Sequence, residues 1–201
     1  CPLPSTLQAG YFGEWWGRGK RFGITTLPGG RVYWYATQNT PANGHNANEK
    51  QAINEAFRDW AEPVPELLAT TLPEKMLRND IVDRPPTTQW SVGRALLIGD
   101  AAHPTTPNFG QGGAMAIEDG VVLARCLRTH KEDYSLAFSA FMRERQPRTA
   151  SITNESWRFG SVGQWEGSFS CWCRNRLFRL LLPLLGSKSL AKHAVFDVGG
   201  L

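Results

Sequence analysis

The stretch "LLIGDAAHPTTPNFGQGGAMAIEDG", which runs from Leu96 to Gly120, constrains the fold of this chain more than any other. An apolar run ends at Asp100, and a loop follows that Pro104 and Pro107 stiffen because each proline fixes φ. Three glycines then remove side chains where a helix begins, namely Gly110, Gly112 and Gly113. The order predicts strand, loop and helix, with Asp100 at the carboxyl end of the strand, where α/β sheets collect ligands.

The residue types in this stretch favour a particular ligand chemistry. An ionised carboxylate at Asp100 only accepts hydrogen bonds, so sugar or polyol hydroxyls are its natural partners. At the start of the predicted helix Gln111–Leu127, the glycines expose N–H groups and the positive end of the helix dipole. Such a cradle suits negative charge, but it lacks the Lys-Ser/Thr pair of a phosphate-binding P-loop. Any one of these residues could belong to an ordinary glycine-rich turn before a helix, with Asp100 in solvent. The Leu96–Gly120 stretch as a whole favours a cofactor site.

This string resembles the second flavin-binding motif of the FAD-dependent aromatic-ring monooxygenases, the class built like para-hydroxybenzoate hydroxylase. Other segments are similar to the same family. Among them, the predicted strands within residues 17–37 are similar to its urate-hydroxylase-like and hydroxybenzoate-hydroxylase-like branch. The similar segments are "GRGKRFGITTLPGGRVYWYAT" at 17–37, "FMRERQPRTA" at 141–150, "SWRFGSVGQW" at 156–165 and "LLGSKSLAKHAVFDVGG" at 184–200. The resemblance therefore covers nearly the whole chain.

The resemblance implies an α/β (α+β) fold, the carboxyl-terminal part of a flavin monooxygenase. Substrate-domain β-strands come first, the strand–loop–helix that closes on FAD follows, and carboxyl-terminal helices end the chain. This divides the sequence into part of a substrate-binding domain over 1–90, the second FAD-binding motif over 91–130 and a helical region over 131–201. The family's strand–GxGxxG–helix unit for the ADP half of FAD and its Asp-Gly motif are not found, so we expect a fragment of such an enzyme.

The resemblance also implies roles for individual residues. Asp100 would bind the flavin ribityl chain, and the helix start would face the pyrimidine edge of the ring, where reduction leaves negative charge. The residues near the flavin are Pro107, Gly110, Gln111, Gly112, Gly113 and Ala114, and those near flavin and substrate are Pro104, Thr105 and Thr106. The implied reaction uses FAD, NADPH or NADH, and O2 to hydroxylate an aromatic or heteroaromatic substrate through a flavin C4a-hydroperoxide. In this reaction the protein supplies positioning and a dry pocket.

The aromatic and β-branched runs Arg21–Leu27 and Arg31–Thr37 predict a hairpin, because Pro28–Gly30 between them is a turn signal. By resemblance, Arg21 holds an anionic or phenolic substrate on this hairpin and Tyr33 orients it through its hydroxyl. The alternative makes Arg21 a surface residue and Tyr33 a sheet aromatic. A register slip would put Arg18 or Lys20 in the place of Arg21, and Tyr33, Trp34 and Tyr35 would alternate between the two faces.

Further elements follow from periodicity and breakers. We expect a helix capped by Asn48 with Gln51 at the capping-box position, and four more elements. These are a helix over Val64–Leu72, strands over Asn79–Pro86 and Arg94–Gly99, and a helix over Tyr134–Arg145. Residues 150–201 read as helical with breaks at glycines. Within them Leu177–Gly186 is too short to span a bilayer and predicts a helix buried against the body or a partner, or less favourably a membrane-surface contact.

Composition excludes some classes of function. The net charge of +4 comes from scattered Lys and Arg, which does not favour nucleic-acid binding. Cys171-Trp172-Cys173 is too tight for zinc, so we expect no metal and reduced structural thiols, which fits a cytoplasmic protein. We also expect no transmembrane segment, and a monomer or homodimer. His103 is interpreted as a structural residue. The charged residues of the 141–150 helix are interpreted as ion pairs, and they are Arg143, Glu144, Arg145 and Arg148.

Two alternatives to the hydroxylase stay open. One is a related flavoenzyme, such as a halogenase or a reductase. A halogenase would need a second pocket lysine, and the aromatic strands over 10–37 argue against it. The other is a non-catalytic piece that acts only through protein contacts.

Overall fold

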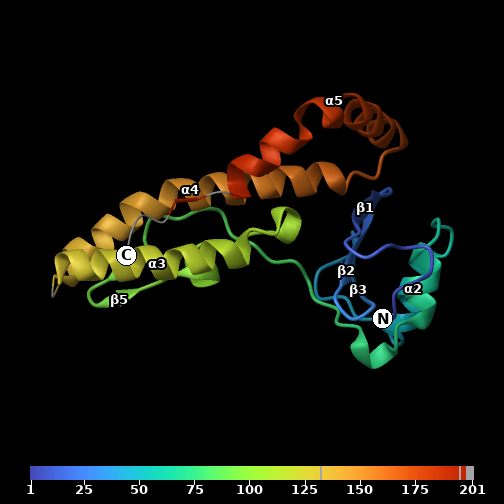
Figure 1. Ribbon diagram of the computed structural model, residues 1–201, viewed down its shortest axis with the longest axis horizontal. Coiled ribbons are helices and arrows are strands. Elements are labelled where there is room, and N and C mark those ends of the chain that lie inside the picture. The colour runs from blue at the N-terminus through green and yellow to red at the C-terminus, as the bar shows by residue number, and fades with distance from the viewer. Residues whose placement is uncertain (132, 195, 198–201) are drawn as a thin grey trace. The chain divides into compact units, whose positions relative to one another are not determined.

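The computed structural model describes residues 1–131, 133–194 and 196–197, with the side chains of the last helix described as far as Leu181 (Figure 1). Within this range the chain forms two compact units. The sheet unit comprises Cys1–Asp80 and Gly163–Trp172, and the helical unit comprises Ile81–Val162 and Cys173–Leu201. Each unit has a hydrophobic cluster of its own. Strands and helices together give the mixed α/β (α+β) class that the sequence predicts. The three-part division by motif stays a prediction.

A three-stranded antiparallel sheet forms the centre of the sheet unit. Its strands are β1 (Phe12–Trp16), β2 (Lys20–Leu27) and β3 (Arg31–Gln38), in that spatial order. The predicted hairpin is confirmed, and its turn uses Gly29 at φ +77° and Gly30 at φ +66°, a backbone region that glycine enters without steric cost.

One face of this sheet is covered by two helices, α1 (Glu49–Phe57) and α2 (Val64–Thr70). A short 3₁₀ turn, η1 (Pro73–Lys75), follows them. The buried cluster between sheet and helices consists of Phe22, Ile24, Val32, Phe57, Val64, Leu67 and Leu68. Because side chains alternate along a strand, the residues between these on β2 and β3 lie on the other face.

The predicted cap of α1 is confirmed in one of its two bonds. The Gln51 backbone N–H donates to Asn48 Oδ1 at 3.0 Å. The Gln51 side chain, however, donates to Glu55 Oε1 at 3.0 Å, one turn further along the helix. The helix therefore has the N-cap without the reciprocal bond of a full capping box.

The two strands predicted after residue 78 differ from the structure. Asn79–Pro86 forms no strand, and the apolar run of Arg94–Gly99 is reduced to β5 (Ala95–Leu96), paired with β4 (Ser91–Val92). A strand needs a neighbour for its N–H and C=O groups. Among the described residues, the one strand that pairs with β5 is two residues long, so the ladder ends there and the chain turns into the 3₁₀ turn η2 (Gly99–Ala101).

Three helices make up most of the helical unit, and the first residues of the last one belong to the sheet unit. They are α3 (Gly112–His130), α4 (Tyr134–Gly163) and α5 (Ser168–Ala194), and the 3₁₀ turn η3 (Pro107–Phe109) precedes α3. Figure 1 shows α3 and α4 running alongside each other. Their common cluster consists of Trp90, Ala102, Val122, Cys126, Ala137, Phe138 and Phe141.

The predicted helix over Gln111–Leu127 is confirmed, but helix breaks at glycines are mostly wrong. Helix α4 passes through Pro147 and Gly160, and α5 contains Gly186. A glycine inside a helix costs only about 1 kcal/mol, which the burial of side chains such as Phe141 and Ile152 outweighs. Within residues 150–194, the chain leaves the helical state between α4 and α5, where Gly163 and Gly167 stand.

The first part of the Leu177–Gly186 stretch is exposed rather than buried against the body. Leu177 is 56% exposed and Leu180 is 69% exposed, and the side chains beyond Leu181 lie outside the described residues. Across the described chain, none of the helices combines the length and the apolar character needed to cross a bilayer. All four cysteines are free thiols.

Candidate flavin site

The turn after β5 presents Asp100 to solvent. The N–H groups of Ala102 and His103 both donate to the Gly99 carbonyl at 2.9 Å, which closes a tight turn with Gly99 at φ +57°. The carboxylate of Asp100 is exposed on this turn and points toward the start of α3. A Cβ placed on Gly112 would lie 3.9 Å from Asp100 Oδ1. The structure therefore brings together the aspartate and the glycine-rich helix start, as the sequence predicts.

The N-terminus of α3 is open. Gln111 makes no side-chain capping bond, and the N–H groups of a first helical turn have no partner inside their own helix. Gly113 and Ala114 are exposed, and a Cβ placed on Gly110 or Gly113 would meet no atom within 4 Å. Several backbone donors and the positive end of the helix dipole thus face free space.

The loop between the aspartate and α3 is fixed to α4. Thr106 Oγ1 lies 2.8 Å from Ser156 Oγ, which donates to the Thr106 carbonyl at 2.8 Å. The amide of Asn108 donates to Thr106 Oγ1 at 2.8 Å and to the Ser156 carbonyl at 2.9 Å. The hydroxyl of Thr106 is therefore engaged by α4, while Pro104 is half-buried and Pro107 is exposed. Their proximity to a substrate stays a prediction.

Thr105 differs from its neighbour Thr106. Its hydroxyl oxygen is buried and has no hydrogen-bond partner within the described residues, while its methyl group lies 3.6 Å from the place of a Cβ on Gly112. An unpartnered buried hydroxyl is costly unless a ligand or water meets it. Together with the Asp100 carboxylate for polyol hydroxyls and the open N-terminus of α3 for an electron-rich edge, this donor set fits a flavin.

A buried ionic network lies behind the turn, and the part of Asp119 in it was not predicted. Asp119, on α3, is fully buried, and its Oδ2 accepts hydrogen bonds from the Gly99 N–H at 2.9 Å and from His103 Nε2 at 2.7 Å. Its Oδ1 accepts from Nε of Arg145, on α4, at 2.7 Å. Burial alone would raise the pKa of Asp119, but the hydrogen bonds from His103, Gly99 and Arg145 outweigh burial and lower that pKa. Asp119 is therefore ionised, and His103 donates through Nε2.

The same network continues along the helices through Glu118. Its carboxylate lies 2.7 Å from Nη2 of Arg145 and accepts two hydrogen bonds from Arg148, at 2.9 and 2.7 Å. Both guanidinium groups lie over the ring of Phe196, at 4.7 and 4.6 Å. The predicted ion pairing of the 141–150 helix is thus confirmed for Arg145 and Arg148, and also for Glu144, which pairs with Arg125. The sequence did contain a signal for this network. The acidic pair Glu118-Asp119 lies in one predicted helix, and Arg145 and Arg148, three positions apart, lie in the next.

The second group of predicted residues lies on the face of the sheet away from α1 and α2. Arg21 pairs across the strands with Trp16 and Thr37, which fixes the register. Lys20 lies on the opposite face and donates to the Ala56 carbonyl at 2.8 Å, and the exposed Arg18 donates to the Glu166 carbonyl at 2.7 Å. Of Arg18, Lys20 and Arg21, the register therefore places Arg21 on the same face as Tyr33.

Arg21 is only 2% exposed, so it is not a surface residue. Its Nε donates to Glu14 Oε1 at 2.5 Å, and its guanidinium lies 5.2 Å from the centre of the Trp16 ring. Burial, followed by the nearby Glu14 carboxylate, raises the pKa of Tyr35 to about 12. Tyr33 is 58% exposed, and its ring lies 6.5 Å from that of Tyr35. Arg21 and Tyr33 thus share a face that carries both charge and aromatic rings.

Gly23 explains why Tyr35 lies on this part of the sheet. It is the cross-strand partner of Tyr35, and a Cβ on Gly23 would lie 2.2 Å from the Tyr35 ring. Real side chains do not approach so closely, so the ring occupies the space that a side chain would need.

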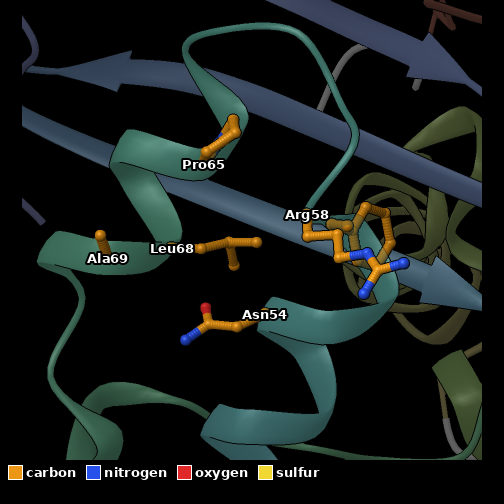
Figure 2. Close-up of a pocket in the computed structure, with 6 residues that line it drawn as sticks. Asn54, Arg58, Pro65, Leu68 and Ala69 are labelled. Atoms are coloured by element: carbon orange, nitrogen blue, oxygen red, sulfur yellow. The ribbon is translucent and has the colours of Figure 1, made fainter.

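Two hollows in the structure lie away from these predicted residues. Figure 2 shows one between α1 and α2, with a volume of about 240 Å³. It is lined by Asn54, Phe57, Arg58, Pro65, Leu68 and Ala69. Another, of about 460 Å³, lies between the 86–88 loop and α4. Neither contains a predicted site residue, and no cluster of three His, Cys, Asp or Glu side chains in the described residues could hold a metal ion.

Comparisons with known proteins agree with this chemistry. Residues 3–182 match the family model described as "FAD binding domain". The aurachin C monooxygenase/isomerase of Stigmatella aurantiaca is 41% identical over 182 residues, which are 90% of this chain and 47% of that protein. The 2-heptyl-3-hydroxy-4(1H)-quinolone synthase of Pseudomonas aeruginosa is 37% identical over 206 residues, 98% of this chain and 52% of that protein.

A solved structure of Klebsiella pneumoniae HpxO complexed with FAD and uric acid matches with a TM-score of 0.77 and 25% identity, over 90% of this chain and 46% of that one. The chain thus spans about half the length of the relatives that it matches. The family match covers most of the chain and includes both the Asp100 turn and the start of α3. The chain belongs to the FAD binding domain family, and FAD is the cofactor that this membership assigns to it.

Proposed function

We propose that the protein is an FAD-dependent monooxygenase that uses NADPH or NADH and O2 to hydroxylate a heteroaromatic ring. The net reaction converts ring C–H, O2, NAD(P)H and H⁺ into ring C–OH, H2O and NAD(P)⁺. The observation that carries the proposal is the exposed Asp100 carboxylate beside the open, glycine-rich N-terminus of α3. The aurachin and quinolone enzymes among the relatives support a ring of the quinolone class as substrate.

Bound FAD supplies electron transfer from NAD(P)H and the activation of O2. The chain's own residues hold it. Asp100 accepts hydrogen bonds from the ribityl hydroxyls, and the N–H groups of Gly112, Gly113 and Ala114 face the pyrimidine edge of the ring. A helix N-terminus stabilises negative charge there without having to reorganise during the reaction. Gly110 and Gly113 leave room for this approach because a side chain at either position would occupy the open space.

The sheet face supplies the substrate contacts in this proposal. Arg21 donates to a carbonyl or phenolate oxygen of the ring, and Tyr33 orients the ring through its hydroxyl. The Arg21–Glu14 ion pair holds the guanidinium in a fixed direction before the substrate arrives. Thr105 and Pro104 lie on the loop beside the flavin. We further propose a cytoplasmic protein that acts as a monomer or homodimer.

The test incubates the FAD-loaded protein with NADH or NADPH, ¹⁸O2 and the 2-heptyl-4(1H)-quinolone that lacks a 3-hydroxyl group. We expect NAD(P)H oxidation that depends on the quinolone and a product heavier by one ¹⁸O atom, measured by mass spectrometry. Asp100→Asn, which keeps the size of the side chain, should weaken FAD binding.

Other outcomes separate the alternatives. A halogenated or reduced product would replace the hydroxylase by a related flavoenzyme. The chain is assayed alone, and again together with the part of a relative that it does not cover. If neither assay shows quinolone-dependent NAD(P)H oxidation, the proposed activity is wrong.

A further inference from the structure

The buried Asp119 network raises a question that the proposed flavin contacts leave open. Asp100 is exposed on a short turn, yet a ribityl contact requires its carboxylate to stay in one place. Exposed side chains on turns ordinarily move, and the free energy of a hydrogen bond falls when the bond must first order its partner. Something must fix the turn.

Asp119 contacts the turn at both ends. Its Oδ2 accepts from the Gly99 N–H, one residue before Asp100, and from the His103 side chain, three residues after it. On the opposite side of the turn, Arg84 donates to the carbonyls of Ala101 at 3.1 Å and Ala102 at 2.9 Å. The backbone that carries Asp100 is thereby held at four points within five residues.

The network also fixes Asp119 itself. Its Oδ1 is held by Arg145, a fully buried guanidinium that also donates to the Met115 carbonyl at 3.2 Å. Asp119 and Met115 both lie on the first turns of α3, so the same group ties the turn to the helix start. The Asp119 carboxylate therefore links the turn that carries Asp100 to the first part of α3.

We propose that Asp119 is a positioning residue for flavin binding, which sets the distance between Asp100 and the N-terminus of α3. This inference rests on the proposed ribityl contact of Asp100. The Asp119 carboxylate accepts from three N–H donors, those of Gly99, His103 and Arg145. Asparagine cannot take over this role, because it has one acceptor oxygen and its NH2 group would face one of these donors. Glutamine at position 103, in contrast, carries an amide N–H at about the place of His103 Nε2.

The test titrates the 201-residue chain with riboflavin and with lumiflavin, which lacks the ribityl chain, and follows flavin fluorescence. The ratio of the two dissociation constants measures the ribityl contribution. We expect Asp119→Asn to weaken riboflavin binding roughly 10-fold or more, because charged hydrogen bonds of this kind are lost, and to change lumiflavin binding little. His103→Ala should act in the same direction, and His103→Gln should restore binding.

Glu118→Gln is the matched control. It removes an ion pair with the same Arg145 one residue away on α3, but the Glu118 carboxylate pairs with Arg145 and Arg148 on α4 and not with the turn residues 99–103 among the described residues. We expect it to lower stability and to leave the ribityl contribution unchanged. The double variant Asp100→Asn/Asp119→Asn should bind riboflavin no worse than whichever single variant has the larger dissociation constant. Both substitutions remove the same ribityl contact, so their effects should not add.

Additive losses in the double variant, or an equal ribityl loss in Glu118→Gln, would overturn the inference. If the parent chain binds riboflavin and lumiflavin equally, the ribityl contact of Asp100 fails, and amide hydrogen exchange decides the inference by itself. Asp119→Asn must then lose protection at Gly99 and His103 while Glu118→Gln keeps it. Unchanged protection in Asp119→Asn would show that Asp119 does not fix the turn.

Discussion

Both units bury arginine side chains, and two of these, Arg145 and Arg21, have different surroundings. Arg145 in the helical unit is fully buried and lies against the carboxylates of Glu118 and Asp119. Arg21 in the sheet unit pairs with Glu14 and lies beside aromatic rings on a face that ends in the exposed Tyr33. A buried guanidinium enclosed by helix carboxylates fixes geometry, whereas the guanidinium on the sheet face is proposed to have a second role in binding the substrate.

The largest expected effect comes from Arg145. Arg145→Met takes the guanidinium away from the fully buried Asp119 and leaves Glu118 with Arg148 alone, which should cost about 3–5 kcal/mol in the free energy of unfolding. Denaturant titration of the parent and the variant measures this difference. Arg125→Met, which breaks the partly exposed pair with Glu144, is the control and should cost at most about 1 kcal/mol. Equal costs for the two variants would contradict a structural role for the network.

The next effect is a dependence on pH. Because the folded-state pKa of Asp119 is lowered, its contribution to stability is complete above the unfolded value of about 4 and is lost as pH falls through the folded pKa. The free energy of unfolding should therefore fall as the pH drops below about 4. Asp119→Asn should show a smaller fall over the same range in denaturant titrations, and an identical fall would count against the network.

Arg21 should separate stability from recognition. Arg21→Met breaks a pair whose Glu14 partner is partly solvated, so we expect a stability loss smaller than that of Arg145→Met, about 1–3 kcal/mol. Arg21→Lys keeps the charge but loses the fixed fork, so it should keep most stability and still raise the KM for a quinolone. If Arg21→Lys leaves KM unchanged, Arg21 serves the sheet and does not contact the substrate.

The smallest effect on stability belongs to Tyr33. Because its side chain is exposed, Tyr33→Phe should change the free energy of unfolding by no more than about 0.5 kcal/mol. Its expected effect is on substrate affinity alone, measured as a KM increase with unchanged kcat. Tyr35→Phe on the same face is a useful comparison, since its hydroxyl faces Glu14 rather than open space.

The sequence predicted the elements that local rules determine. Asn48 capped its helix, Pro28–Gly30 formed the hairpin turn, and the glycines around residue 112 opened a helix, since each depends on neighbours in the chain. The strand over Asn79–Pro86 failed because a strand requires a partner that its own residues do not reveal.

The unpredicted part of the site depends on contacts distant in the sequence. Asp119 and Arg145 are 26 positions apart, and nothing local distinguishes Asp119 from the exposed carboxylates of other helices. In the same way, the burial of Arg21 follows from its register with Trp16 and Thr37, which the pattern alone left open between Arg18, Lys20 and Arg21.

The central claim is that the helical unit binds flavin at the start of α3. Amide chemical shifts from ¹⁵N–¹H spectra of the chain during FAD titration test it most directly. The account predicts that the largest shifts fall on Gly110, Gly112, Gly113 and Ala114, together with the Asp100 turn. Largest shifts at the hollow between α1 and α2, or no shifts at saturating FAD, would contradict it.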